Sequence, residues 1–478
     1  MLVTGASLPN GTHAIAGITW WSESRPTEGG RTQIVRRDSD GTTHDLLPAS
    51  SNARNRVHEY GGGAWWVHGG TIYFTNWSDQ RLYRLDRGST EPVAITPEPA
   101  VQHGWRYADG TLTPDGRYVI CVREAHDAGG VSNELVAVPA AGGPATVLAS
   151  GRDFVAAPRV SRDGRRLVWL TWDHPNMPWD STELWIADMT FDSADRTDRA
   201  DRADRADRAD RADRAPGAAH PAEGDTIALT GAHRMAGRPE ESLVQPEWGA
   251  SGELFVVSDR SDWWNVYRVS GIDELVPVHP IAAEVGEPAW VFGQSNYLVA
   301  DDGTIWFTYA GDGNARLVCV APDASSVDRG TPYVRMDHLA WDSGRIVAIA
   351  TESAREASVV EIDTASLAAD GDVTNDATGF TVLRPPRDLG LDDGSISRPR
   401  HISFPSSGGR TAHGWFYPPA NASAVGPDGE LPPLLVLIHG GPTSAARPEF
   451  ALPTQFWTSR GFALVDVDYG GSTGYGRR

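Results

Sequence analysis

One pattern returns along most of the chain: a polar turn containing a glycine precedes a short run of apolar residues at every second position. It occurs as "NGTHAIAGITW", "HGGTIYFTNW", "TPDGRYVICV", "SRDGRRLVWLTW", "GASGELFVVSD", "ADDGTIWFTYA" and "WDSGRIVAIA". Alternation at period two in segments rich in aromatic and β-branched residues predicts β-strands. We therefore expect a chain built mainly of short strands.

The spacing of these turns indicates a repeat. The turn glycines are Gly11, Gly70, Gly116, Gly164, Gly252, Gly303 and Gly344. By subtraction, their intervals are 59, 46, 48, 88, 51 and 41 residues. A period of about 40 to 50 residues with several strands per unit is typical of propeller blades. The pattern predicts a seven-bladed β-propeller over residues 1–380.

The longest interval contains a low-complexity insert at residues 191–222, where Asp-Arg pairs recur every three residues. Oppositely charged residues at this spacing could support a helix. A solvated insertion in a blade loop is the favoured interpretation, because removing roughly 30 residues returns the interval to blade size.

A different pattern begins after residue 380. The run "LPPLLVLIHGG" has no polar alternation, which is typical of a buried parallel strand. The segment "PTQFWTSRGFA" then predicts a short helix ended by Gly461, and "FALVDVDY" predicts the next strand. Strand, helix and strand in this order indicate a βαβ unit, so residues 381–478 are expected to begin a second, α/β domain.

The loop "HGGP" follows the apolar strand. Glycines at the carboxyl end of a parallel strand let backbone N–H groups approach a substrate oxygen, as in the oxyanion hole of α/β-hydrolases. The alternative is a plain strand-to-helix turn. His439 is interpreted as structural, since the catalytic histidine of that fold comes last in the chain.

"GGSTG" at residues 470–474 matches G-x-S-x-G, with Ser472 at the nucleophile position. Two features argue against a nucleophile elbow: this is the first strand after the glycine loop, and no helical pattern follows. The histidines after residue 400 (His401, His413 and His439) all precede it, which is the wrong order for a triad.

Composition narrows the class of protein. The formal net charge is −21, which argues against nucleic acid or an anionic membrane as partner. Two cysteines, no apolar span and no leader-like N-terminus predict a cytoplasmic protein, with secretion after loss of a leader as the alternative. No cofactor or metal is expected, because His174 in "WDHPNMPWD" lacks any ligand spacing and its loop is better explained by the prolines. The sequence assigns no oligomeric state.

Five separated motifs, in order, resemble the prolyl oligopeptidase family of serine peptidases, nearest to its acylaminoacyl-peptidase and dipeptidyl-aminopeptidase branch. They are "VHEYGGGAWW", "DHPNMPWDSTELW", "QPEWGASGELFVVSDRSDWWNVYR", "IHGGP" and "VDYGGSTGYGR". The resemblance runs from about residue 15 onward. It implies a propeller that caps an α/β-hydrolase domain, a Ser-Asp-His triad, and short peptides as substrates.

Carried over to this chain, the resemblance assigns one oxyanion N–H to Gly441, with Gly440 as the second choice. It makes Glu59, Glu183 and Glu247 candidates for holding a substrate amine, although Glu59 could equally accept bonds from neighbouring backbone N–H groups. The family's serine, aspartate and histidine would follow "GSTGYG", so the 478 residues are expected to lack the triad and to be inactive alone. The competing hypotheses are a non-catalytic propeller scaffold and an esterase of the α/β-hydrolase type.

Overall fold

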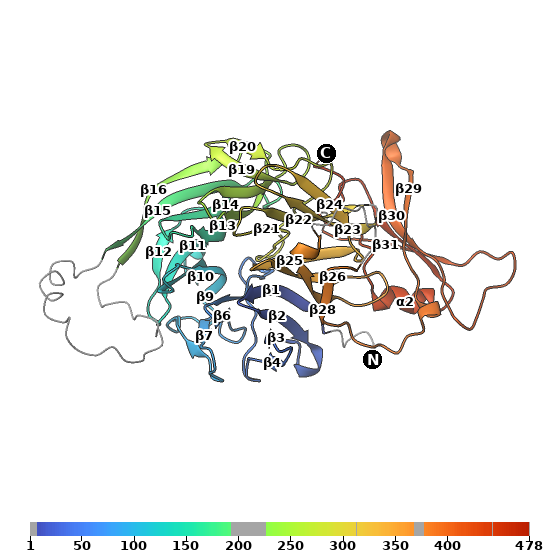
Figure 1. The fold of residues 1–478 in the computed structure, drawn as a ribbon, viewed down its shortest axis with the longest axis horizontal. Coiled ribbons are helices and arrows are strands. Elements are labelled where there is room, and N and C mark those ends of the chain that lie inside the picture. Colours follow the sequence, from blue (N-terminus) through green and yellow to red (C-terminus); the bar gives the residue numbers. More distant parts are fainter. Residues whose placement is uncertain (1–6, 193–225, 312, 368–376, 442, 478) are drawn as a thin grey trace, which may run out of the picture. The chain divides into compact units, whose positions relative to one another are not determined.

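The computed structural model describes residues 7–192, 226–311, 313–367, 377–441 and 443–477. Eight four-stranded sheets account for nearly all of its regular structure (Figure 1). The expected insert at 191–222 lies almost entirely outside the described residues. No helix within the described ranges is long and apolar enough to cross a membrane.

In seven of the sheets, consecutive strands are hydrogen-bonded neighbours, as in the blades of a β-propeller. The sheets consist of β1 (Pro9–Ile15), β2 (Ile18–Arg25), β3 (Arg31–Arg37) and β4 (Thr43–Asp45); β5 (Trp65–His68), β6 (Thr71–Thr75), β7 (Leu82–Leu85) and β8 (Val93–Ala94); β9 (Trp105–Leu112), β10 (Tyr118–Asp127), β11 (Gly130–Pro139) and β12 (Thr146–Ala149); β13 (Phe154–Val160), β14 (Arg166–Trp172), β15 (Glu183–Asp192) and β16 (Thr226–Ala236); β17 (Leu243–Trp248), β18 (Leu254–Ser258), β19 (Asn265–Gly271) and β20 (Glu274–Pro277); β21 (Tyr297–Val299), β22 (Ile305–Gly311), β23 (Asn314–Val320) and β24 (Ser326–Gly330); β25 (Arg335–Asp342), β26 (Arg345–Thr351), β27 (Ser358–Asp363) and β28 (Phe380–Arg384).

The eighth sheet has a different order, β29-β30-β32-β31, and contains one parallel pair, β31 and β32. Its elements are β29 (Arg400–Pro405), β30 (Thr411–Tyr417), β31 (Leu434–Ile438), α2 (Leu452–Thr458) and β32 (Ala463–Asp468). The remaining helices are α1 (Thr364–Leu367) and the 3-10 turns Pro26–Glu28, Asp393–Ser395 and Ser407–Gly409. The βαβ connection expected from the sequence is therefore present.

Two details of this sheet differ from the sequence prediction. The helix ends at Thr458, with Ser459 as its C-cap, and Gly461 takes its left-handed φ of 86° after the helix. Strand β31 is not buried: it is the outermost strand, and Leu434, Val436 and Ile438 are 55%, 55% and 67% exposed. An apolar run predicts a parallel strand correctly, but its burial depends on what covers the sheet.

The turn glycines explain where the second strand of each sheet begins. Six of them, all with positive φ, stand one or two positions before the first residue of that strand, for example with a φ of 70° at Gly116 and 72° at Gly164. The first sheet is the exception. Gly11 lies inside β1 at a register shift, and the glycine that corresponds to the others is Gly17, with φ 83° before β2.

The sheets are joined by apolar cores made from residues far apart in the chain. One cluster lies between the first and seventh sheets and consists of Ala14, Trp21, Val35, Val347, Ile349, Val359 and Leu383. Polar contacts reinforce this seam: the amides of Ala16 and Gly17 donate to the Asp342 carboxylate at 3.0 and 2.8 Å. The described strands of these two sheets form separate hydrogen-bonded sheets with no strand in common. The seam between them is therefore made by side chains and turn amides.

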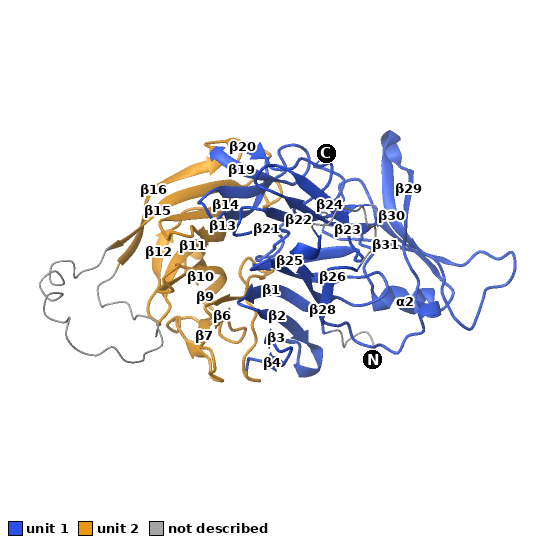
Figure 2. Ribbon diagram, viewed as in Figure 1, with its two compact units in different colours: residues 1–47, 241–270, 275–478 blue, residues 48–240, 271–274 orange. Residues whose placement is uncertain are grey.

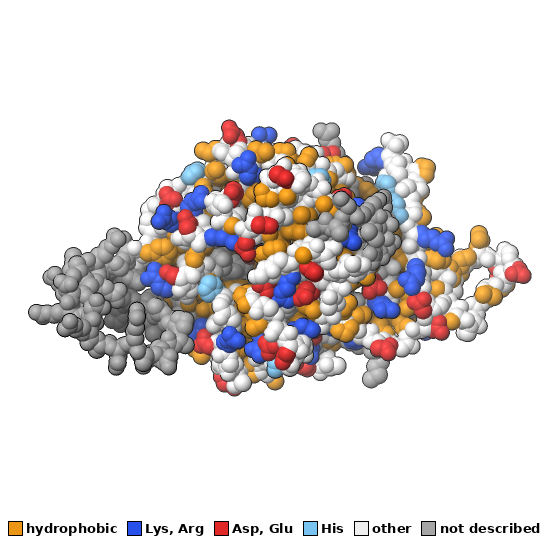
Figure 3. All heavy atoms as spheres, viewed as in Figure 1, with side chains coloured by type: hydrophobic (Ala, Val, Ile, Leu, Met, Phe, Trp, Pro, Cys, Tyr) orange, Lys and Arg blue, Asp and Glu red, His pale blue; other side chains and the backbone are white. Residues whose placement is uncertain are grey.

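By compactness the chain forms two units, residues 1–47, 241–270 and 275–478 in one and residues 48–240 and 271–274 in the other (Figure 2). The second unit holds the second, third and fourth sheets. Because β28 pairs with β27, the seventh sheet reaches residue 384. Acidic and basic side chains are interspersed on the face shown in Figure 3, despite the net charge of −21.

Candidate active site

The glycine loop leaves the carboxyl end of β31, beside β32. Gly441 has a φ of 119°, which side chains rarely adopt, although the nearest atom to a Cβ there would be 3.4 Å away. Backbone conformation rather than space therefore favours glycine. No acceptor among the described residues takes the N–H of Gly440 or Gly441. Both amides lie at the sheet end where α/β enzymes bind their ligands.

His439 is held inside this loop by three contacts. Its ring stacks on Tyr469, with 4.4 Å between centroids. Its Nε2 lies 2.7 Å from the Ser472 hydroxyl, and its Nδ1 lies 3.2 Å from the carbonyl oxygen of Gly440. The pairing with Ser472 was not anticipated from the sequence, because it joins the glycine loop after β31 to the segment after β32.

Ser472, His439 and Asp468 thus come together, but not as a catalytic triad. In a triad the carboxylate bonds Nδ1 of the imidazole while Nε2 faces the serine. Here Asp468 Oδ1 lies 3.9 Å from Nε2, the nitrogen that already faces Ser472. The two carboxylate oxygens instead accept bonds from the Ala446 amide at 2.7 Å and the Tyr475 hydroxyl at 2.9 Å. The arrangement is a hydrogen-bonded support for the glycine loop.

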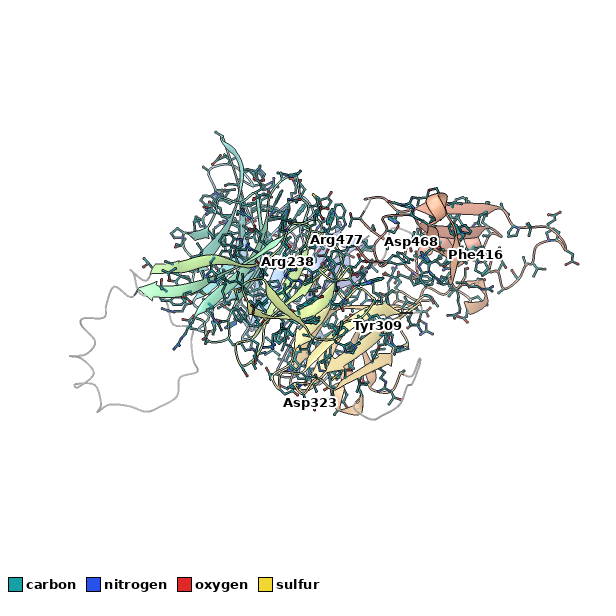
Figure 4. All side chains as sticks on the ribbon, turned by 90° about the horizontal axis from the view of Figure 1, so that it is seen from above. Arg238, Tyr309, Asp323, Phe416, Asp468 and Arg477 are labelled. Carbon is teal, nitrogen blue, oxygen red and sulfur yellow. The ribbon has the colours of Figure 1, made fainter. Side chains whose placement is uncertain are left out.

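The segment after β32 is anchored at several points. The amide of Thr473 donates to the carbonyl of Ser444 at 2.8 Å. The amide of Gly476 donates to Glu284 at 3.2 Å, and the guanidinium of Arg477 pairs with Asp259 (Asp468 and Arg477 are labelled in Figure 4). Burial, with only partial relief from two backbone amides, raises the pKa of Glu284 to about 7.

A cluster of charges joins the segment after the glycine loop to two other parts of the chain. Glu287 accepts from Arg335 at 3.0 Å and from Arg447 at 3.1 Å, and Arg335 also pairs with Glu449 and Asp337. Burial raises the pKa of Glu287, but the two guanidinium groups outweigh it and lower the pKa to about 2. No motif in the sequence marks this cluster, because its members come from separate segments.

In the second unit, the carboxylate that accepts a backbone N–H at the "HEYGGG" motif is not the one that the sequence suggested. Glu59 has a side chain that is 79% exposed and pairs with Arg106, at 3.3 Å. The carboxylate that accepts a backbone N–H there is Glu124, which receives the amide of His58 at 2.7 Å. Glu124 also pairs with Arg106 and His126, at 2.8 and 2.6 Å. Sequence reasoning missed Glu124, which lies in the middle of β10.

His58 predicts a pH dependence of stability. Its ring packs edge-on against Phe154 and Trp172, and burial lowers its pKa to about 4. The folded chain therefore binds this proton less readily than the unfolded chain, and stability falls as the pH drops from about 6.5 to about 4. We expect His58→Phe to reduce this fall, measured by urea unfolding at pH 7 and pH 4.5. His44→Phe, on the exposed strand β4, is the control; an unchanged pH dependence in His58→Phe would contradict the prediction.

The other candidates from the sequence lie on different elements, and each has its own contacts. Glu183 pairs with Arg152 and accepts the indole N–H of Trp185, and Glu247 lies in β17. His174 contacts the ring of Phe154, and its amide donates to Asp153. Within the described ranges, no group of three or more His, Cys, Asp or Glu side chains could hold a metal ion.

Among comparisons with known proteins, only the comparison with solved structures finds similar proteins. No family model matches the chain, and no curated protein sequence does. Among solved structures, a puromycin-hydrolysing peptidase of Mycobacterium tuberculosis is 32% identical, with a TM-score of 0.84, covering 100% of this chain and 68% of that one. A puromycin hydrolase is also 32% identical, with a TM-score of 0.85 and the same coverage.

More distant structures share the fold. The acylaminoacyl peptidase of Pyrococcus horikoshii is 14% identical, with a TM-score of 0.63, covering 99% of this chain and 66% of that one. The identity to the puromycin-hydrolysing enzymes extends over the whole chain, the glycine loop included. The motifs, the four-stranded sheets and this identity agree: the chain belongs to the prolyl oligopeptidase family of serine peptidases.

Proposed function

We propose that this chain is the propeller and the first part of the hydrolase domain of a serine peptidase that cleaves short peptides through an acyl-enzyme. The observation that carries the proposal is the glycine loop at the end of β31. Gly441 has a backbone conformation that suits glycine, and its N–H is not taken by another described residue. The 32% identity to puromycin-hydrolysing peptidases supports the same assignment.

In this proposal the seven consecutive sheets form a seven-bladed propeller over about residues 1–380. Residues 381–478 contribute the first strands of an α/β-hydrolase sheet. Support comes from the order of the strands and from the seam that joins the first sheet to the seventh. The propeller would restrict entry to small or unfolded peptides.

The chemistry assigned to the glycine loop is electrostatic. When a serine attacks a peptide carbonyl, the oxygen gains negative charge, and a preorganised N–H donor stabilises it. Gly441 would supply one such donor, with Gly440 as the second choice. His439 and Ser472 would hold the loop rather than react, since Asp468 faces the wrong imidazole nitrogen.

We propose that the nucleophilic serine and its histidine and aspartate are not among these 478 residues. Ser472 is the G-x-S-x-G serine after β32, and residues 473–477 behind it form no helix. An elbow needs that helix to expose its serine. The 478-residue chain is therefore expected to be inactive on its own, whether the protein is located in the cytoplasm or in another compartment.

The test is active-site labelling with a fluorophosphonate probe, which reacts with activated serines. The 478-residue chain is compared with the chain extended by its own downstream reading frame, and the labelled peptide is mapped. Labelling only of the extended chain, on a serine beyond Arg478, supports the proposal. Labelling of Ser472 in the short chain would overturn the argument from the geometry of Asp468. Absence of label in both chains would favour a non-catalytic propeller scaffold.

Substrate assays on the unlabelled protein, in whichever form reacts with the probe, separate the remaining alternatives. Aminoacyl and acylaminoacyl amides, puromycin and simple p-nitrophenyl esters are compared. Hydrolysis of the amides is expected. Turnover of esters alone would favour an esterase.

A further inference from the structure

The loop after Gly441 is in contact with a segment of the propeller half of the chain. The indole N–H of Trp290, between β20 and β21, donates to the carbonyl oxygen of Thr443 at 2.7 Å. The same ring lies beside Gly441: a Cβ built on that glycine would be 3.7 Å from Trp290 Cζ2. One side chain therefore lies beside the proposed oxyanion glycine and is hydrogen-bonded to the backbone two residues after it.

The same propeller segment also holds the other end of the loop. Glu287 precedes Trp290 closely in the chain and accepts from Arg447 at 3.1 Å. Residues 287–290 are thus hydrogen-bonded to the loop at Thr443 and at Arg447. On the hydrolase side, Ser472 and Thr473 are hydrogen-bonded to the loop. Both halves of the chain contribute to its position.

The position of this loop matters because an oxyanion donor acts only when it is aimed before the reaction begins. Small misplacements of catalytic groups have large effects on rate. Glycine restricts its own backbone less than any other residue. The direction of the Gly441 N–H must therefore be determined by the groups packed around it, and Trp290 is one of these.

We propose that Trp290 is a positioning residue for the oxyanion loop. Its indole N–H holds the Thr443 carbonyl and its ring limits the movement of Gly441, so that a propeller side chain orients a donor of the hydrolase domain. This inference rests on the proposed function for its catalytic consequence. The contacts of the loop themselves can be tested without any activity.

The kinetic test uses the chain extended by its downstream reading frame. Trp290→Phe keeps a ring beside Gly441 and removes the N–H. Without this hydrogen bond the N–H of Gly441 is less well aimed at the transition state, and kcat is expected to fall about tenfold. KM should stay within about twofold, since the substrate itself does not lose a contact. Trp341→Phe is the matched control, because Trp341 lies in β25 and its indole N–H donates to Asp301, between β21 and β22, at 3.2 Å.

A second measurement uses the 478-residue chain alone. Amide hydrogen exchange in Trp290→Phe should become faster at Ala446 and Thr473, whose N–H groups are hydrogen-bonded at the loop, and should stay unchanged in the sheets. A wild-type enzyme that hydrolyses peptides, with Trp290→Phe at full kcat, would overturn this inference and leave the proposed function intact. An extended wild-type chain that neither labels nor hydrolyses would refute the proposed function, and hydrogen exchange would still decide whether Trp290 holds the loop. Unchanged exchange at Ala446 and Thr473 counts against the inference in every case.

Discussion

Replacing Glu287 with leucine is expected to lower the free energy of unfolding by about 3 kcal/mol. The substitution leaves Arg335 and Arg447 without the carboxylate that pairs with both. Removing one partner of a buried ion pair typically costs about 3–5 kcal/mol, and the lower end applies because the Glu287 side chain is 27% exposed. Urea unfolding of the 478-residue chain measures the effect.

The control for this prediction is an exposed ion pair. Asp393→Asn removes the partner of Arg398, in a pair whose side chains are 82% and 57% exposed, and should change the unfolding midpoint very little. An equal midpoint for wild type and Glu287→Leu would show that the charge cluster does not contribute.

Glu287 also carries a pH signature of its own. Because its pKa is lowered to about 2 in the folded chain, its contribution is present above the ordinary glutamate range and is lost as the pH falls toward 2. The stability difference between wild type and Glu287→Leu should therefore shrink in acid. A constant difference from pH 7 to pH 3 would contradict the assignment of the low pKa to this group.

Gly441→Ala is expected to lower kcat of the extended chain about 10²–10³-fold, the usual effect of losing one oxyanion donor. Alanine meets no close contact there, but it resists a φ of 119°, so the peptide that carries the N–H has to rotate. Steady-state hydrolysis of an aminoacyl amide is the measurement.

The control for Gly441→Ala is Gly344→Ala. Gly344 has a φ of 93° in the turn before β26, and a Cβ there would meet nothing within 4 Å. Both substitutions strain a turn, but only Gly441 lies in the glycine loop. Equal kcat values for the two variants would remove Gly441 from the oxyanion role.

Local patterns predicted the elements well. Alternating apolar residues mark the strands, and a glycine with positive φ marks six of the seven expected turns. The shift from Gly11 to Gly17 in the first sheet shows the limit of this signal. Gly11 follows the polar Asn10 and Gly17 follows Ala16, and only the pairing of β1 with β2 shows which of them makes the turn.

Contacts between distant segments were beyond such patterns. Trp290 and Thr443 are separated by 153 positions, and Glu287 and Arg447 by 160. The hydrogen bond between His439 and Ser472 likewise depends on β31 and β32 lying in parallel. The sequence pointed to the glycine loop, but the residues that hold this loop became visible only once the sheets were assembled.

The seam between the first and seventh sheets also affects how the chain is made. Trp21 and Val35 emerge from the ribosome early, whereas Val347 and Ile349, against which they pack, are more than 300 positions later. At about 5–20 residues per second, translation takes roughly 15–60 s to supply those partners. During that interval an apolar face of the first sheet is without its partner, so the nascent chain needs protection from aggregation until the seventh sheet has been synthesised.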